Sequence, residues 1–146
     1  MDFPRIEGFT ALATHPWAYP ALEAAHIAGI ALLVGSLVLL ELRVWGAAPE
    51  LPVPALARLA LAVTAVGFAL VLLSGLAMFS ARPTELLANR AFVLKMGLVM
   101  LAGLNAAWFH GRGSLARLDT LARAQTALSL GLWLGVIILG RWIAYL

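Results

Sequence analysis

Cysteine is absent from this sequence of 146 residues, and its absence excludes several kinds of site. Without thiols, the chain cannot form disulfides, hold an iron–sulfur cluster, attach a c-type haem covalently or build a thiolate metal centre. A cofactor would have to be held by histidine, methionine, lysine, carboxylates or shape. The sequence also lacks a nucleophile–base pair, a phosphate-binding glycine loop and an HExxH motif, so hydrolytic chemistry of the soluble kind has no support.

Charged residues are scarce as well. They make up 12% of the chain, whereas 63% of its residues are hydrophobic; in soluble domains about a quarter of the residues are charged. The net charge of +3 would suggest nucleic acid in a soluble protein, but most basic residues here flank apolar segments, where they contact lipid headgroups. We therefore expect no nucleic-acid partner. Little sequence remains for a second unit, so we expect a single transmembrane domain over residues 1–146.

Four long apolar segments account for most of the chain, over residues 21–45, 54–80, 91–110 and 121–146. Each is long enough for a helix to cross a bilayer, which takes about 20 residues. Lipid offers no hydrogen-bond partner to the backbone, and the segments lack the alternation of a barrel strand, so each must be a helix. The sequence predicts an all-α, integral membrane four-helix up-and-down bundle. Residues 1–15 hold no continuous apolar core, so we expect no cleavable signal peptide.

Arginines near the ends of the segments indicate an orientation. Five lie in or beside the loops after the first and third segments: Arg43, Arg58, Arg112, Arg117 and Arg123. Three lie on the other side: Arg5, Arg82 and Arg90. Because cytoplasmic loops carry the excess of positive charge, this distribution predicts that both termini lie outside the cytoplasm.

Ionisable side chains inside the predicted helices are the candidate site residues, because such groups are costly in lipid and usually face the bundle interior or a partner. Alternating helix directions bring Glu23, His26, Lys95 and Arg141 to one side of the membrane. His26 could be an axial ligand to haem iron or a metal ligand, or a packing histidine hydrogen-bonded to a neighbouring helix. Lys95 and Arg141 could hold haem propionates, although Lys95 could also pair with Glu23 or extend to the headgroups.

Methionines at a similar depth leave a second reading open. Met96 and Met100 lie four residues apart, and Met78 ends the second segment on the same side. Their thioethers, together with His26, could bind Cu(I), or they could be ordinary apolar packing residues. His15 precedes the first helix and could fold back as a second ligand or be exposed in a loop.

Several further residues carry expectations about packing. A stripe of Thr64, Gly67, Val71, Ser74 and Met78 lies on one face of the second helix and is typical of helix–helix contact in lipid. Gly131 and Gly135, four residues apart, favour close packing and make a homodimer plausible. Asn105 is expected to hydrogen-bond to the first or second helix, and His110, with Glu41, to lie at the opposite side of the membrane from His26.

Three segments carry a resemblance to a known group. Residues Pro20–Gly29, Leu40–Gly46 and Ala91–Leu98, followed by Asn105 and His110, look like an uncharacterised family of bacterial four-helix integral membrane proteins of about this length. That family is distantly similar to the membrane domain of CopD-type copper resistance proteins and to HemJ-type protoporphyrinogen oxidases. Both share an early histidine in one helix and an early lysine in a later helix, which match His26 and Lys95.

The resemblance to the HemJ type implies b-type haem on His26 and a role for Lys95, and that to the CopD type implies copper handling. The resemblance also implies a multi-pass protein of the bacterial inner (cytoplasmic) membrane. The arginine distribution predicts that its termini are periplasmic. The leading hypothesis is a b-type haem protein for electron transfer with a quinone or redox partner protein, in a larger oxidoreductase complex. The alternatives are a copper-handling permease and a structural subunit without cofactor; enzymatic activity stays open.

Overall fold

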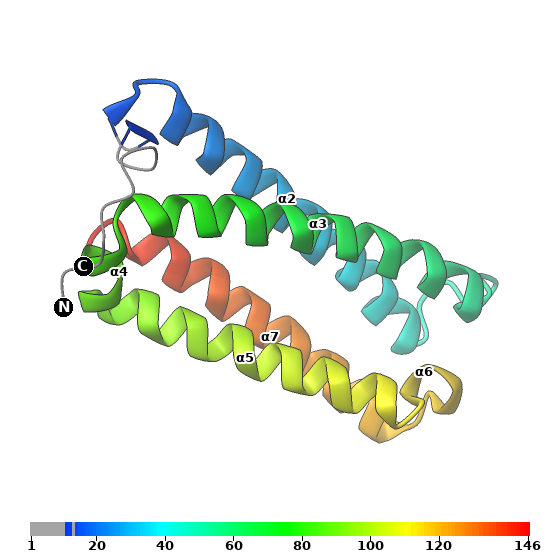
Figure 1. Cartoon of the computed structure of the whole chain (residues 1–146). Helices are drawn as coiled ribbons and strands as arrows, with labels where there is room; N and C mark the ends of the chain where they lie inside the picture. Colours follow the sequence, from blue (N-terminus) through cyan, green and yellow to red (C-terminus); the bar gives the residue numbers. More distant parts are fainter. Residues whose placement is uncertain (1–10, 13) are drawn as a thin grey trace.

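The computed structural model describes residues 11–12 and 14–146, and over these residues the protein is an all-α bundle (Figure 1). Four long helices form it: α2 (Ala18–Val44), α3 (Val53–Ala81), α5 (Arg90–Gly111) and α7 (Thr120–Trp142). Two short helices, α4 (Pro83–Ala88) and α6 (Ser114–Arg117), lie in the connections. No strand occurs within the described residues. The predicted fold class is confirmed.

The helix ends follow local capping chemistry. The side chain of Asn89 accepts a hydrogen bond from the Phe92 amide at the start of α5, and Asp119 accepts one from the Ala122 amide at the start of α7. Such side-chain acceptors satisfy amides that have no partner in the first helical turn. At the other end of α7, the helix stops at Trp142 rather than continuing to Leu146 as the sequence suggested.

All four long helices are long and apolar enough to cross a membrane. Many of their large apolar side chains point outward: Leu73 and Leu104, for example, are 67% and 64% exposed. In a soluble protein such a surface would be an aggregation hazard, whereas in a bilayer it is the surface that lipid covers. The protein is a transmembrane helical bundle.

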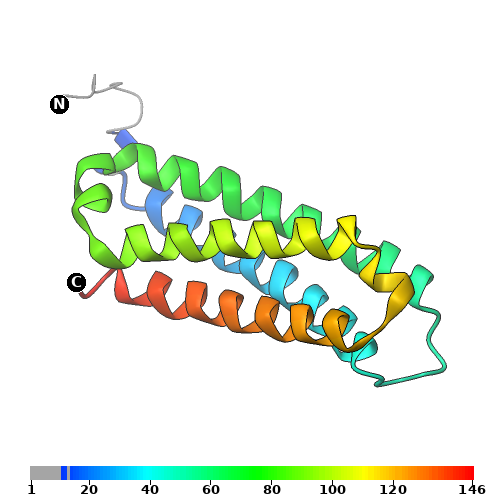
Figure 2. The ribbon, with the colours of Figure 1, turned by 90° about the horizontal axis from the view of Figure 1, so that it is seen from below.

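The bundle consists of two helical hairpins. Helix α2 packs along α3, α5 packs along α7, and the hairpins meet mainly where α2 contacts α7. Figure 2 shows α4 and the C-terminus at one end of the bundle, and α6 and the α2–α3 connection at the other. We call these the His26 end and the Glu41 end, after the residues of α2 that lie toward each.

Helices α2 and α3 cross at two glycines. A Cβ atom on Gly67 would lie 2.6 Å from the Leu33 amide nitrogen, and one on Gly29 would lie 2.9 Å from the Gly67 carbonyl oxygen. The two backbones therefore touch directly, as small residues allow in membrane proteins. About two turns from Gly29 on α2, and about one turn from Gly67 on α3, the Ser36 and Thr64 hydroxyls are 2.7 Å apart. Of the predicted contact stripe on α3, Thr64, Gly67, Val71 and Ser74 contact α2.

The glycine pair on α7 divides between two environments. A Cβ on Gly135 would lie 2.8 Å from the Leu98 side chain on α5, whereas one on Gly131 would have no atom within 4 Å. Gly135 thus belongs to the α5–α7 interface, and Gly131 lies on the outer surface of the chain. A homodimer through Gly131 stays a prediction.

Candidate functional site

The His26 imidazole is held at the α2–α3 interface by a buried serine. Its Nδ1 atom lies 2.9 Å from the Ser74 hydroxyl oxygen, and that hydroxyl donates to the Leu70 carbonyl one turn earlier in α3. Because the hydroxyl proton is committed to Leu70, Ser74 can accept a hydrogen bond from Nδ1–H. This arrangement leaves the lone pair on Nε2, while the ring also lies within hydrogen-bonding reach of the Val71 backbone.

Lys95 is the charged neighbour of this imidazole. The two side chains lie close enough for a Coulombic interaction, although they come from different hairpins. The Lys95 side chain is half-buried and lies against Gly140 of α7, where an added Cβ would be 3.7 Å from Nζ. Within the described part of the chain, the ammonium group has no hydrogen bond and no ion pair. A half-buried cation of this kind is suited to an anionic ligand.

Glu23 and Arg141 lie at the same end but outside this pair. Both side chains are exposed. Arg141 donates a hydrogen bond of 2.7 Å to the Tyr145 hydroxyl and lies 5.1 Å from the centre of that ring. The structure therefore brings His26 and Lys95 together, while the Arg141 side chain interacts with its own C-terminal segment.

The methionines of the copper hypothesis come from α3 and α5. Met96 and Met100 are 44% and 67% exposed on the outer face of α5, and Met78 is half-buried on α3. His15 is exposed, and its Nδ1 accepts a hydrogen bond from the Trp17 amide at 3.3 Å. In residues 11–12 and 14–146, no three His, Asp or Glu side chains gather closely enough to hold a metal ion.

A second polar cluster, at the Glu41 end, was not identified from the sequence. Glu41 of α2, Asn105 of α5 and Gln125 of α7 are only 4%, 7% and 2% exposed. They line a cavity of about 50 Å³, together with Ser129 and His110. Glu41 and His110 lie at the same end of the bundle, as predicted, but the burial of a carboxyl there was not predicted. The available signal was a set of polar residues, Asn105, Gln125 and Ser129, within two largely apolar helices.

The predicted hydrogen-bond partner of Asn105 was wrong. Its side-chain amide donates to the Gln125 carbonyl of α7 at 2.9 Å, not to the first or second membrane-spanning helix. The reason is that α5 pairs with α7 within one hairpin, so the buried face of α5 contacts mainly α7.

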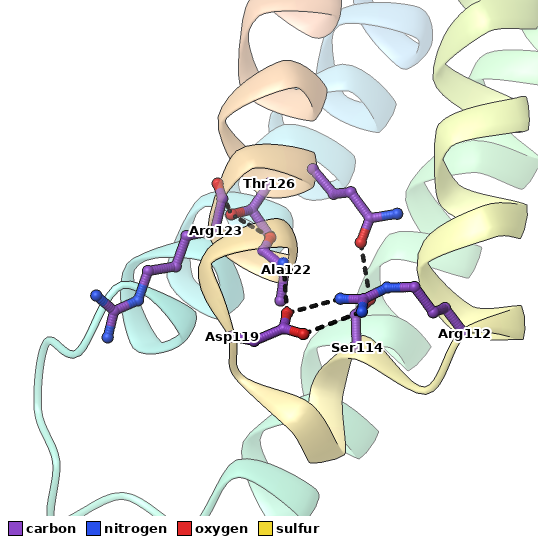
Figure 3. A network of polar contacts seen from close by, with 7 residues as sticks. Arg112, Ser114, Asp119, Ala122, Arg123 and Thr126 are labelled. Carbon is purple, nitrogen blue, oxygen red and sulfur yellow. Dashed lines mark hydrogen bonds and ion pairs between the residues drawn. The ribbon is translucent and has the colours of Figure 1, made fainter.

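The connection between α5 and α7 closes the Glu41 end with a polar network (Figure 3). The Ser114 hydroxyl, which is fully buried, donates to the Gln125 side-chain oxygen at 2.7 Å. Arg112 makes two hydrogen bonds to the Asp119 carboxylate, at 3.0 and 2.7 Å. The Arg112 guanidinium holds the pKa of Asp119 well below its usual range, and the Ala122 amide adds to the effect. This loop is therefore fixed by charge pairing and capping together.

The comparisons add no relative to this geometry. No protein-family model, curated protein or solved structure matches the chain. The candidate sites thus rest on the chain's own residues: His26 with Lys95 at one end, and the Glu41 cavity at the other. A larger hollow of about 410 Å³ between α5 and α7 opens outward and is lined by four leucines with Trp108 and Asn105, which suits lipid tails.

Proposed function

We propose that this protein binds b-type haem through His26 and serves electron transfer in a membrane. The observation that carries the proposal is the orientation of the imidazole. Histidines that bind metals almost always donate their second ring N–H to a neighbouring acceptor, which fixes the tautomer and the ring. Ser74 accepts from Nδ1–H in this way, and Nε2 keeps a free lone pair.

Lys95 supports the same proposal from the other hairpin. A haem carries two propionates, and anionic groups inside a membrane protein require a cation nearby. Lys95 lies near His26, is half-buried and lacks a counter-ion among the described residues. Arg141, at the same end of the bundle, is the second candidate to bind a propionate. Glu23 also lies at this end, but its side chain is exposed. The second axial position is open to His15, a methionine or no ligand.

A b-type haem at His26 would supply one-electron chemistry. The protein's own part is to orient the imidazole through Ser74, to place positive charge beside the anionic groups and to keep bulk water away with apolar helices. The electron donor and acceptor would be a quinone or a redox protein, with this chain as an oxidoreductase subunit of a larger complex. We place it, on the resemblance and the arginine distribution, in a bacterial inner membrane with periplasmic termini.

The direct test is an optical spectrum of protein purified from haem-replete cells. We expect a Soret band, and split α and β bands on reduction. His26→Ala should abolish the Soret band, whereas His110→Ala, at the opposite end, should preserve it. A colourless wild-type preparation, or a Soret band unchanged in His26→Ala, would contradict the proposal.

Lys95 and Arg141 can be separated by a matched pair of variants. Lys95→Met removes the charge that lies beside His26 and should weaken haem retention in detergent. Arg141→Met removes the exposed charge that interacts with Tyr145 and should have a smaller effect.

Metal analysis of the same samples tests the copper alternative: bound copper that is lost in Met96→Ala and Met100→Ala would favour a permease. With neither cofactor present, a stable partner complex would favour a structural subunit.

A further inference from the structure

The buried carboxyl of Glu41 stands apart from the proposed haem site. About 22 Å of helix separates it from His26, at about 1.5 Å per residue. It lies where α2 contacts α7, the contact that joins the two hairpins. The Trp45 indole one turn later donates a hydrogen bond of 2.7 Å to Thr126 of α7. Glu41 is therefore buried within a packed helix–helix interface, although it lies near the end of α2.

Three polar atoms at this interface lack partners within the described part of the chain. They are Oε2 of Glu41, Oδ1 of Asn105 and Nε2 of Gln125, and each is buried. An unpaired polar group in an apolar interior costs about 1–3 kcal/mol. These three atoms around one cavity differ from the buried hydroxyls of Ser36, Ser74 and Thr126, which donate to carbonyls of their own helices. They indicate that something with hydrogen-bonding capacity occupies the cavity.

The chemistry of the three atoms matches one water molecule. A water can donate to two acceptors, here the Glu41 and Asn105 oxygens, and accept from one donor, here the Gln125 amide. A cavity of about 50 Å³ is large enough, since one water needs about 10–15 Å³ of such volume and two to four polar partners. Ser129 lies beside the Glu41 carboxyl as a further hydrogen-bonding neighbour.

Among the residues that the structure describes, no lysine or arginine lines this cavity to balance a negative charge. The arginines on the helices packed around Glu41 are engaged elsewhere or exposed. Arg43 donates to the Leu51 and Pro49 carbonyls, and Arg112 pairs with Asp119; Arg58 and Arg123 are exposed. The titratable group that shares the cavity lining is His110, whose own side chain is exposed. A carboxylate without a counter-ion in such surroundings is costly, and a proton is the smallest ligand that neutralises it.

We propose that Glu41 and this cavity form a proton-binding site inside the membrane, with one water held by Asn105 and Gln125 and with His110 at its mouth. A proton delivered from the solvent at the Glu41 end adds to the carboxylate and leaves again by the same oxygen, so that the site exchanges with that side of the membrane. Chains of Glu, His and water are the usual means by which membrane proteins move protons. The site goes beyond haem binding and does not depend on it.

Infrared difference spectroscopy of the purified protein in lipid nanodiscs tests the proposal. On acidification, wild type should gain the carbonyl stretching band of a protonated carboxylic acid, and the band should shift in D₂O. Glu41→Gln should lack this band. The matched control is Glu23→Gln on the same helix, where the carboxyl is exposed and the Glu41 band should persist.

Three results would overturn the proposal: a band that Glu41→Gln retains, a band that does not change with pH, or a band that does not exchange with D₂O. The last two would describe a sealed, permanently protonated acid with a structural role only. Asn105→Leu keeps the carboxyl and removes one partner of the water, so it should shift the band frequency and slow deuterium exchange; wild-type values would contradict the water link. The carboxyl band can be measured even in a variant that has lost haem. The proton-binding proposal can therefore be contradicted without contradicting the haem proposal, and the reverse is also true.

Discussion

The two ends of the bundle solve the problem of polar groups in lipid in different ways. At the Glu41 end, polar side chains from α2, α5 and α7 are almost fully buried and interlock with the α5–α7 loop through Ser114. At the His26 end, His26 and Lys95 are half-buried. Burial thus closes one end around a small cavity, whereas at the other end the ionisable groups stay in partial contact with the surroundings of the bundle.

The difference originates in how the hairpins are joined. Between the two ends, α2 and α3 are held together at the tight crossing of Gly29 and Gly67. At the Glu41 end, Trp45 at the end of α2 also donates a hydrogen bond to Thr126 of α7. At the His26 end the link between α3 and α5 is the short helix α4, with Phe79 stacked on Phe92 at a centroid distance of 5.8 Å. Stability should therefore be concentrated at the crossing and the Glu41 end.

The largest effect is expected at the shared crossing. Gly67→Leu forces a side chain into the α2 backbone, 2.6 Å away at the Cβ position, and should destabilise the protein by about 3 kcal/mol. Unfolding in mixed micelles, followed by circular dichroism, measures it. The control is Gly35→Leu, where no atom lies within 4 Å of the added Cβ; it should change stability by less than about 1 kcal/mol. Equal losses in both variants would mean that the crossing is not the critical contact.

A smaller loss should distinguish the two ends directly. Ser114→Val removes the donor to the buried Gln125 oxygen and should cost about 1–3 kcal/mol. Ser80→Val at the His26 end removes an exposed hydroxyl that bonds only to the Leu76 carbonyl of its own helix, and should cost less than about 0.5 kcal/mol. Chemical unfolding of both variants checks the contrast. Similar costs would show that the Glu41 end is no more tightly specified than the other.

The His26 end should instead be sensitive in ligand binding. Ser74→Ala removes the acceptor that orients the imidazole and should lower haem affinity by about 10–100-fold. Haem titration of the apoprotein gives the constant. Ser36→Ala is the matched control, because it also removes an interhelical hydroxyl contact, with Thr64, away from His26. A similar loss of affinity in the control would assign the effect to helix packing.

The smallest effect concerns the exposed Arg112–Asp119 pair in the loop of the Glu41 end. Because folding lowers the pKa of Asp119, the pair stabilises the protein above the unfolded-state pKa of about 3.9. That contribution is lost as the pH falls through the lower folded-state pKa. Asp119→Asn keeps a capping side chain but removes the charge. Its melting temperature should be slightly below that of wild type at neutral pH, and the two should converge in strong acid; a constant gap would contradict the assignment.

Much of the candidate site could be read from the sequence because depth follows from chain position. Once four apolar segments cross a membrane in alternating directions, His26 and Lys95 must share one side, and Glu41 and His110 the other. The contact stripe through Gly67 and Ser74 was likewise visible, since small and polar residues repeat at helical spacing. Glu23 and Arg141 were placed at the right end for the same reason, but depth alone could not tell that their side chains are exposed.

Only the tertiary structure decided which faces meet. A helix that is apolar all round carries almost no signal for its rotation about its own axis, since lipid and protein neighbours are equally apolar. Ser74 as the partner of His26, Gly140 beneath Lys95 and Gln125 as the partner of Asn105 all depend on that rotation. The pairing of α5 with α7 and the docking of α7 on α2 then closed three helices around Glu41. Chain order and hydropathy determined the membrane-spanning helices and the depth of each ionisable group; side-chain packing between hairpins decided which of those groups became a site.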